Sequence, residues 1–317
     1  MVTMVVGSRA SRLARAQVRE WLAVTRQQFP QVKFKQRVIL EGGDEDRETP
    51  TLAEVAKTTG GSAFSTNQEH ALLEGEVDII VHSLKDLPTS MPDGLALLRT
   101  PGRRQDVRDV LCGSTLATLP KGARVGTGAP RRIGQLLALR PDLQMVPIRG
   151  NVPPRLARLR GAEALDAVVL AAAGLNRLGL RHLISEHLPI GSFLPSPGQA
   201  ALGIQVREGS EAARLLASTG NATLDAEVRA ERTLLAELHG GCSVPIGAYG
   251  KAQADGTLTL SAQVSAVDGT RHVTAHGSGT VHSPEELGRR VADELLERGA
   301  EDLLSAVRPA PSSESRG

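Results

Sequence analysis

Four arginines that could bind an anionic ligand lie beside glycine- and proline-rich turns within one stretch of 25 residues; they are Arg131, Arg132, Arg149 and Arg155. Residues 125–132 (VGTGAPRR) are typical of a strand, a tight turn and a helix start, where proline is tolerated. Free N–H groups at a helix start and paired guanidinium groups both suit carboxylate or phosphate. Each arginine alone could be a solvated surface residue, but the four together predict a site for a ligand with several negative charges.

A second group of ionisable residues follows an apolar segment. Residues 77–81 (VDIIV) predict a buried strand, and residues 82–88 (HSLKDLP) come directly after it. α/β domains bind ligands at the carboxyl ends of their strands. Asp86 could therefore act as a general acid or base, or hold a ligand N–H or a cationic amine. The alternatives are that Asp86 only turns the chain ahead of Pro88 and that Lys85 is solvated.

The chain has two cysteines, Cys112 and Cys242. Residues 240–245 (GGCSVP) place Cys242 on an uncrowded loop between a predicted helix and a predicted strand, where reactive residues are often displayed. A structural cysteine in a tight turn is the alternative. Cys112 follows apolar residues and is expected to be buried. Neither a disulfide framework nor a metal site is expected from two cysteines without ligand spacing.

Composition narrows the class of partner. Only six of the 37 basic residues are lysine, yet 35 acidic residues leave a net charge of +2. A nucleic-acid-binding protein would usually carry a larger basic excess and more aromatic stacking platforms than the 2% aromatic content found here. The longest apolar run, residues 167–175, is too short to span a membrane, and no signal-peptide-like apolar segment precedes residue 7. We expect a cytoplasmic protein without nucleic-acid or membrane partners.

The first two-thirds of the chain alternates apolar strands with amphipathic helices, which is typical of α/β domains. A weak repeat relates residues 6–12 (VGSRASR) to residues 125–131 (VGTGAPR). The repeat could be chance; otherwise it predicts two similar α/β domains that face each other. Strands are expected at residues 34–40, 77–81, 124–127, 145–148 and 167–170, and helices from about residue 11 and around residues 68–74.

The last third has a different pattern. Residues 221–238 predict a charged amphipathic helix, and residues 257–266 alternate in the manner of an antiparallel strand with one wet face. Residues 283–286 (SPEE) form a capping box that predicts a single helix to about residue 307. These elements indicate a small α+β domain, followed by a Pro/Ser-rich tail at residues 309–317 that is expected to be disordered.

Together these segments resemble one family, hydroxymethylbilane synthase, also called porphobilinogen deaminase. The resemblance runs from Gly7 to the final helix, and so many ordered motifs are highly specific. The matching segments are residues 7–11 (GSRAS), 78–88 (DIIVHSLKDLP), 140–143 (RPDL), 149–152 (RGNV), 173–179 (AGLNRLG), 197–199 (PGQ) and 240–247 (GGCSVPIG).

The resemblance implies an α/β plus α+β fold with three domains. Two are periplasmic-binding-protein-like α/β domains, comprising residues 1–99 with 199–218 and, inserted between these, residues 100–198. The third, residues 219–308, is a small α+β domain that carries Cys242. A monomer is expected.

The resemblance also implies a reaction and its residues. Cys242 would hold a dipyrromethane cofactor through a thioether, and four porphobilinogen molecules would be joined with loss of ammonia. Asp86 would be the catalytic carboxylate, stabilising a cationic azafulvene and assisting proton transfer. The predicted cofactor-binding residues are Cys242, Arg131, Arg132, Arg149, Arg155, Lys85 and Ser83, and the predicted substrate-binding residues are Arg9, Ser11, Arg177, Phe64 and Gln199.

Several positions depart from the family pattern. Residues 60–69 (GGSAFSTNQE) keep Phe64 and Glu69 but lack the lysines usual in this loop. Residues 127–130 (TGAP) lack two hydroxyls of the usual Thr-Ser-Ser-Leu, residues 153–154 are both proline, and Ala200 replaces a glycine. We expect residues 57–67 to form a mobile loop in which Phe64 contacts the pyrroles. The alternatives to an active enzyme are a two-lobed small-anion-binding protein and a pyrrole-binding paralogue without turnover.

Overall fold

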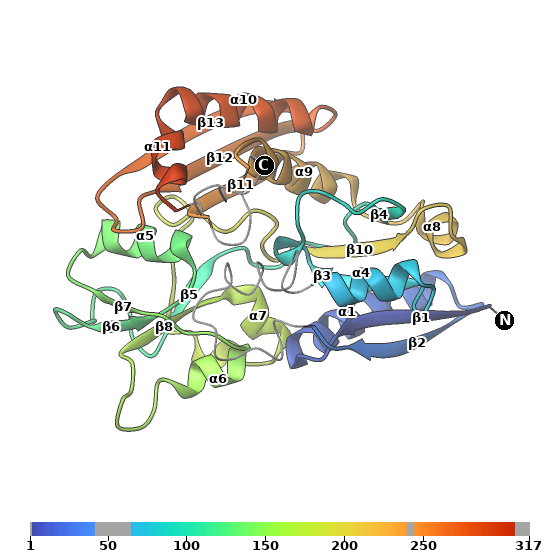
Figure 1. The fold of residues 1–317 in the computed structure, drawn as a ribbon, viewed down its shortest axis with the longest axis horizontal. Helices are drawn as coiled ribbons and strands as arrows, with labels where there is room; N and C mark the ends of the chain where they lie inside the picture. Colours follow the sequence, from blue (N-terminus) through green and yellow to red (C-terminus); the bar gives the residue numbers. More distant parts are fainter. Residues whose placement is uncertain (1, 42–64, 240–243, 308–317) are drawn as a thin grey trace, which may run out of the picture.

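The computed structural model describes residues 2–41, 65–239 and 244–307, and three sheets organise them (Figure 1). The first sheet has the strand order β2-β1-β3-β10-β4. Its strands are β1 Val2–Arg9, β2 Val32–Ile39, β3 Ile79–Ser83, β4 Leu95–Leu97 and β10 Leu202–Arg207. The helices around it are α1 Arg12–Gln28, α4 Thr66–Leu73, the 3-10 helix η1 Leu84–Asp86 and α8 Glu211–Leu216. Apolar clusters cover both faces of this sheet, so that its central strands are buried.

The second sheet has the order β7-β6-β8-β5-β9. Its strands are β5 Asp109–Cys112, β6 Arg124–Gly126, β7 Gln144–Val146, β8 Ala167–Ala171 and β9 Glu186–His187. Its helices are α5 Pro130–Leu139, α6 Val152–Ala157, α7 Ala172–Arg177 and the 3-10 helix η2 Arg181–Leu183. Pro130 occupies the first turn of α5, as the sequence predicted.

The two sheets share one topology, which gives the weak sequence repeat a structural counterpart. β1 pairs in parallel with β2 and β3, and β6 pairs in parallel with β7 and β8. In each sheet one antiparallel strand comes next, β10 beside β3 and β5 beside β8. In the first sheet this antiparallel strand, β10, is the last strand in chain order, whereas in the second sheet it is β5, the first strand in chain order. The chain therefore crosses between the sheets twice, around residues 100–108 and 195–200.

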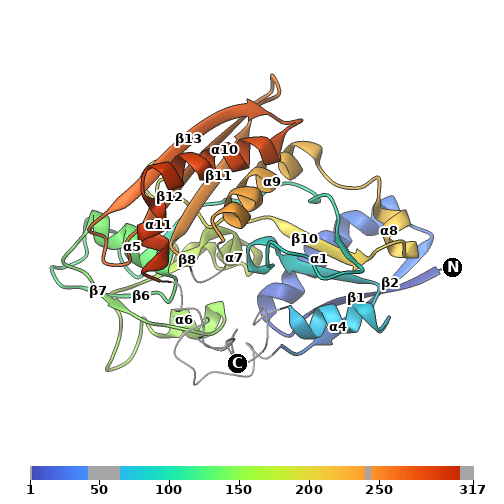
Figure 2. The same cartoon turned by 45° about the horizontal axis from the view of Figure 1, so that its top comes forward.

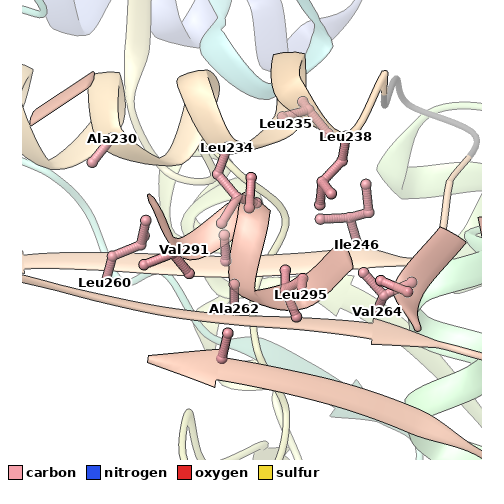
Figure 3. Packing of buried hydrophobic residues seen from close by; sticks show 14 of the residues in the cluster. Ala230, Leu234, Leu235, Leu238, Ile246, Leu260, Ala262, Val264, Val291 and Leu295 are labelled. Carbon is pink, nitrogen blue, oxygen red and sulfur yellow. The ribbon is translucent and has the colours of Figure 1, made fainter. Parts of the chain in front are cut away.

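The third unit is a three-stranded antiparallel sheet with helices packed on it. Its strands are β11 Ile246–Ala252, β12 Thr257–Ser265 and β13 His272–Thr280, and its helices are α9 Ala222–Glu237, α10 Pro284–Glu297 and α11 Ala300–Ser305. The alternation in β12 puts Leu258, Leu260, Ala262 and Val264 into the core. Figure 3 shows α9 and α10 contributing Leu234 and Leu295 to the same core. The predicted fold class, α/β plus α+β, is confirmed.

One predicted helix is wrong. The helix expected from residue 283 to 307 ends at Glu297, and α11 starts after Gly299. Gly299 has φ +88°, a left-handed conformation that breaks the helix and that glycine adopts without a side-chain clash. The capping-box hydrogen bond of Ser283 is also absent from α10, where Pro284 occupies the first turn.

The third unit touches both α/β units. Figures 1 and 2 show it lying across them, with α5 beneath one end and α9 running towards β10. A Cβ atom at Gly134 of α5 would lie 2.4 Å from the Ala266 carbonyl, so glycine allows the helix to approach the end of β12. On the other side, Arg232 of α9 donates to the carbonyls of Leu87 and Pro88.

Candidate active site

The turn after β3 carries the predicted catalytic carboxylate. Leu84 is fully buried and anchors η1, which leaves Lys85 and Asp86 half-buried at the end of the strand. The second crossover, around residues 195–200, packs directly on this turn at Gly198. A Cβ atom there would lie 3.3 Å from the backbone nitrogen of Lys85. Gly198 also has φ +72°, so a larger residue would be both strained and crowded here.

Two of the predicted arginines lie at the start of α5 and converge on one carboxylate. Arg131 and Arg132 are each 5% exposed, and Asp109, the first residue of β5, is fully buried. Asp109 Oδ1 accepts from Arg132 NH2 at 2.6 Å and from Nε at 3.2 Å, and Asp109 Oδ2 pairs with Arg131 NH2 at 2.8 Å. Arg131 NH1 also donates to the Leu194 carbonyl and Arg132 NH1 to the Val169 carbonyl. This cluster is therefore rigidly held by the protein itself.

Gln199 connects the two α/β units. Its Nε2 donates to Asp109 Oδ1 at 3.1 Å and to the Val107 carbonyl at 2.7 Å. Its Oε1 accepts from Lys85 Nζ at 3.1 Å. The predicted residues Lys85, Gln199, Arg131 and Arg132 thus belong to one hydrogen-bonded network that reaches from η1 to α5.

Arg149 and Arg155 complete the cation cluster from the ends of β7 and α6. Arg155 is the fourth residue of α6, and its Nε donates to the Gly150 carbonyl at 2.7 Å. Burial lowers the pKa of Arg155 to about 10, with the positive charges of Arg132 and Arg149 acting in the same direction and Asp86 opposing them. Arg155 therefore lies within electrostatic reach of both arginine groups and of the predicted catalytic carboxylate.

The cluster carries surplus positive charge in a desolvated setting. Burial lowers the pKa of Lys85 to about 8; Arg132 and Arg131 reinforce this, while Asp86 and Asp109 oppose it. Within the described residues, five cations (Lys85, Arg131, Arg132, Arg149, Arg155) face two carboxylates (Asp86, Asp109). A ligand with several carboxylates would relieve this repulsion. The residues present therefore fit a dipyrromethane, which carries acetate and propionate groups.

Other predicted residues lie at the ends of neighbouring elements. Ser83 Oγ accepts from Gln17 Nε2 at 2.7 Å, so α1 supports the strand that leads to Asp86. The Ser11 hydroxyl caps α1 by accepting from the Ala14 N–H at 3.1 Å. Arg9 ends β1, and its charge acts on Glu41 and His82.

Arg177, predicted to bind substrate, is ion-paired within the protein. Its Nε lies 2.7 Å from Glu20 Oε2, and its NH2 donates to the Ala200 carbonyl at 3.1 Å. Glu20 also accepts from Gln105 of the first crossover. Arg177 thus links α7 of the second unit to α1 of the first.

Two predicted residues lie outside the described residues. They are Cys242, the expected attachment point, and Phe64, together with residues 57–64 of the predicted loop. The other cysteine, Cys112, is buried in β5 as predicted, and burial raises the pKa of its thiol to about 11. A thiol in that state is a poor nucleophile at neutral pH.

The departures from the family pattern alter two helix starts. At α5, Ala129 offers no side-chain cap, although its N–H donates to Thr127 Oγ1 at 3.3 Å. At α6, Pro153 and Pro154 have no N–H, so this short helix has few backbone donors for an anion. Side chains, rather than backbone amides, must supply the contacts there.

Sequence reasoning missed Asp109, Glu20 and Gln17. Asp109 stands directly before the apolar residues 110–112, and a carboxylate at the start of a buried strand is a signal that could have been used. Gln17 lies on the buried face of α1, between Ala14 and Val18. Nothing in the sequence distinguishes Glu20 from a solvated helix residue.

Two α/β units that meet at a desolvated, cation-rich centre define a two-lobed protein for a polyanionic ligand. The chain belongs to the porphobilinogen deaminase family. Residues 4–215 match the family model "Porphobilinogen deaminase, dipyromethane cofactor binding domain", and residues 226–297 match "Porphobilinogen deaminase, C-terminal domain".

Curated relatives cover nearly the whole chain. Porphobilinogen deaminase of Desulforudis audaxviator is 44% identical over 308 residues, covering 96% of this chain and 98% of the relative. Porphobilinogen deaminase of Thermus thermophilus is 43% identical over 312 residues, covering 97% of this chain and 100% of the relative.

Two solved structures resemble this chain only weakly. The sulfonate-binding protein SsuA from Methylobacillus flagellatus KT has a TM-score of 0.37 at 11% identity, over 75% of this chain and 68% of that chain. The methionine-binding protein MetQ has a TM-score of 0.39 at 11% identity, over 68% and 88%. Within the described part of the chain, no helix is long and apolar enough to cross a membrane.

Proposed function

We propose that this chain is a transferase that condenses four porphobilinogen molecules head to tail, releasing one ammonia at each step, and then frees hydroxymethylbilane with water. The observation that carries this proposal is the surplus of desolvated cations beside Asp86, in a chain whose residues 4–215 match the cofactor-binding domain of porphobilinogen deaminase. Each pyrrole brings two carboxylates, which suit the guanidinium and ammonium groups of the cluster.

A dipyrromethane bound through a thioether to Cys242 supplies a free pyrrole α-carbon as the nucleophile. Arg131, Arg132, Arg149, Arg155, Lys85 and Ser83 hold the carboxylates of the bound chain, and Arg9, Ser11, Arg177, Phe64 and Gln199 contact the incoming substrate. Because guanidinium groups bind carboxylates with two parallel hydrogen bonds, they fix orientation as well as charge.

Asp86 handles the charge and the proton of each condensation. The C–N bond of the substrate's protonated aminomethyl group breaks, and neutral ammonia leaves with the bonding pair, so the methylene carbon becomes positive. Asp86 stabilises this cation and accepts a hydrogen bond from the pyrrole N–H. A C–C bond then forms, and the proton released from the attacking carbon passes by way of Asp86 to the departing ammonia.

Arg177 can bind substrate while its ion pair with Glu20 stays in place. Its Nε lies 2.7 Å from Glu20 and its NH2 donates to the Ala200 carbonyl. A guanidinium has five N–H donors, so donors remain for a substrate carboxylate.

Intact-mass measurement tests the proposal. Purified protein should carry an adduct of two linked pyrroles, and Cys242→Ser should lose both the adduct and activity. Cys112→Ala is the matched control and should keep both, because Cys112 is buried in β5. Turnover by unmodified protein would exclude the cofactor role, and an adduct without turnover would indicate a pyrrole-binding paralogue.

We also propose a cytoplasmic monomer with the domain limits predicted from the sequence. Light scattering and cell fractionation test these two points, and limited proteolysis near residues 100 and 199 tests the limits.

A further inference from the structure

Asp109 is a fully buried carboxylate that the reaction described above does not use. It is the first residue of β5 and pairs across the sheet with Ala171 of β8. Burial disfavours its charge, but Arg131, Arg132 and Lys85 outweigh that effect and hold the pKa of Asp109 well below its usual range. Asp109 is therefore ionised at neutral pH.

Asp109 fixes the orientation of both α5 arginines. Arg132 uses all three of its nitrogens on protein acceptors, two on Asp109 and one on the Val169 carbonyl. Arg131 is held by Asp109, by the Leu194 carbonyl and by the ring of Phe193, whose centroid lies 5.9 Å from its guanidinium carbon. A guanidinium has five N–H donors, so each arginine keeps donors for a ligand in a direction that Asp109 sets.

Asp109 also acts on Lys85 across the two units. Gln199 connects the two residues: its Nε2 donates to Asp109 Oδ1, and its Oε1 accepts from Lys85 Nζ, both at 3.1 Å. Lys85 adjoins Asp86 on η1, so the carboxylate of the second unit is connected to the catalytic turn of the first.

We propose that Asp109 is a positioning residue for the condensation, orienting Arg131 and Arg132 directly and the Lys85 ammonium through Gln199. This inference rests on the proposed function. The Asp109 carboxylate is part of the protein and is present whether or not a ligand is bound. It therefore holds Arg131, Arg132 and Lys85 together before a ligand binds, and their geometry does not depend on the length of the bound chain.

Asp109→Asn removes the charge at constant shape. The amide would turn an N–H donor towards one guanidinium, so the arginines should reorient. Misplacement of about 1 Å can lower turnover on the order of 100-fold, and we expect a fall of about 10- to 100-fold in kcat. Asp109→Glu restores the charge and should recover part of the loss.

The pH profile distinguishes positioning from a general loss of structure. Among the described residues, the charges that act on Lys85 include Asp86 on its own turn, Asp109 on β5, and Arg131 and Arg132 on α5. Without Asp109, Lys85 loses its proton at a lower pH than in the wild type. The alkaline fall in kcat, expected near pH 8 in the wild type because Lys85 then loses the charge with which it holds the bound chain, should therefore begin at lower pH in Asp109→Asn and return towards pH 8 in Asp109→Glu.

Gln199→Met is the second variant, because it breaks the path to Lys85 and leaves both arginines on Asp109. It should lower kcat, and its effect should be smaller when combined with Asp109→Asn than alone. Asp142→Asn is the control, since Asp142 binds Arg140 in the same unit away from the cluster, and its kinetics should match the wild type.

Wild-type turnover and adduct mass are measured first and test the proposed function separately. Given an active wild type, unchanged kcat and an unchanged alkaline limb in Asp109→Asn would overturn the positioning role. If Asp109→Asn does not fold, Gln199→Met decides: an alkaline limb of kcat that begins at lower pH than in the wild type supports the proposal, and an unshifted limb refutes it.

Discussion

At position 86 the charge of the side chain should decide turnover. Asp86 is half-buried, and its negative charge acts on both Lys85 and Arg155. Asp86→Asn keeps the shape and can still hydrogen-bond, but it can neither neutralise a cation nor accept a proton. Turnover should fall by about two or more orders of magnitude, measured as single-turnover ammonia release.

The control for Asp86 lies in the same unit. Asp93 is exposed in the turn before β4, and Asp93→Asn should leave turnover unchanged. Nearly normal turnover in Asp86→Asn would mean that Asp86 only turns the chain and that another group transfers the proton.

Individual site residues could be predicted where a local pattern marks them. Lys85 and Asp86 follow an apolar strand, and Arg131 and Arg132 follow a strand-turn-helix signature. The apolar residues 110–112 mark Asp109 as a candidate buried carboxylate, but Asp106 and Arg108 beside it form a partly exposed ion pair of the ordinary surface kind and give no sign of its role. Its importance comes from partners 22 to 90 residues away, which only the fold brings together.

At the scale of the elements, a buried network joins β3, β10 and α4. His82 Nε2 lies 2.9 Å from Gln205 Oε1, and Gln205 Nε2 donates to Glu69 Oε1 at 3.1 Å. Burial lowers the pKa of His82 to about 4, and the hydrogen bond that Gln205 Oε1 accepts only partly opposes this. The imidazole is therefore neutral in the folded protein at neutral pH.

His82 should make stability depend on pH. Between pH 6.5 and 4 the imidazole of His82 binds a proton in the unfolded chain but not in the folded protein. The contribution of neutral His82 to the free energy of unfolding is therefore complete above pH 6.5 and is lost as the pH falls towards 4. The difference amounts to about 3 kcal/mol. His82→Gln can keep the hydrogen bond and should remove this dependence in urea unfolding at a series of pH values.

The variant must be compared with the wild type because other groups titrate nearby. Burial raises the pKa of Glu69 and of Glu41, and these shifts act against the His82 effect over the same pH range. His272→Gln, on the exposed surface of β13, is the control. Equal pH slopes in His82→Gln and the wild type would contradict the prediction.

Elements were predicted well where burial follows a simple period. The bounds of strand β12 and of the amphipathic helix α9 differ from the predicted bounds by at most one residue. The break between α10 and α11 was missed because the apolar positions continue in helical register through Leu303 and Leu304, while Gly299 changes the backbone direction.

At the scale of the whole molecule, Glu231 of α9 joins the third unit to both crossovers. It accepts two hydrogen bonds from Arg104 at 2.8 Å, and one each from the N–H groups of Gly198 and Gly250 at 2.7 Å. Glu231 is fully buried, and the Arg104 side chain is 8% exposed. Any rotation of one α/β unit against the other must bend the chain next to this point.

Glu231→Gln should be strongly destabilising, because it leaves Arg104 buried without its main counter-charge. The expected loss is on the order of 3–5 kcal/mol in the free energy of unfolding. Glu76→Gln breaks the exposed pair with Arg37 and should cost less than about 1 kcal/mol. A similar small loss for both variants in chemical denaturation would show that this buried pair contributes little.

The inserted arrangement of the second unit came from the family resemblance and not from periodicity. The partner of β3 in the first sheet is β10, and no local pattern in residues 202–207 indicates that they pair with residues 79–83. Strand pairing over such separations depends on the packing of the complete fold.

The late position of β10 has a consequence for synthesis on the ribosome. The strands of the second sheet are contiguous in the chain, whereas the first sheet lacks the strand between β3 and β4 until residues 202–207 have emerged. Closing that long loop is slow compared with local pairing. The second sheet can therefore form before the first is complete. Until then the nascent chain carries β3, with its apolar residues Ile79, Ile80 and Val81, unpaired along one edge, and an unpaired apolar edge is where chains associate with one another.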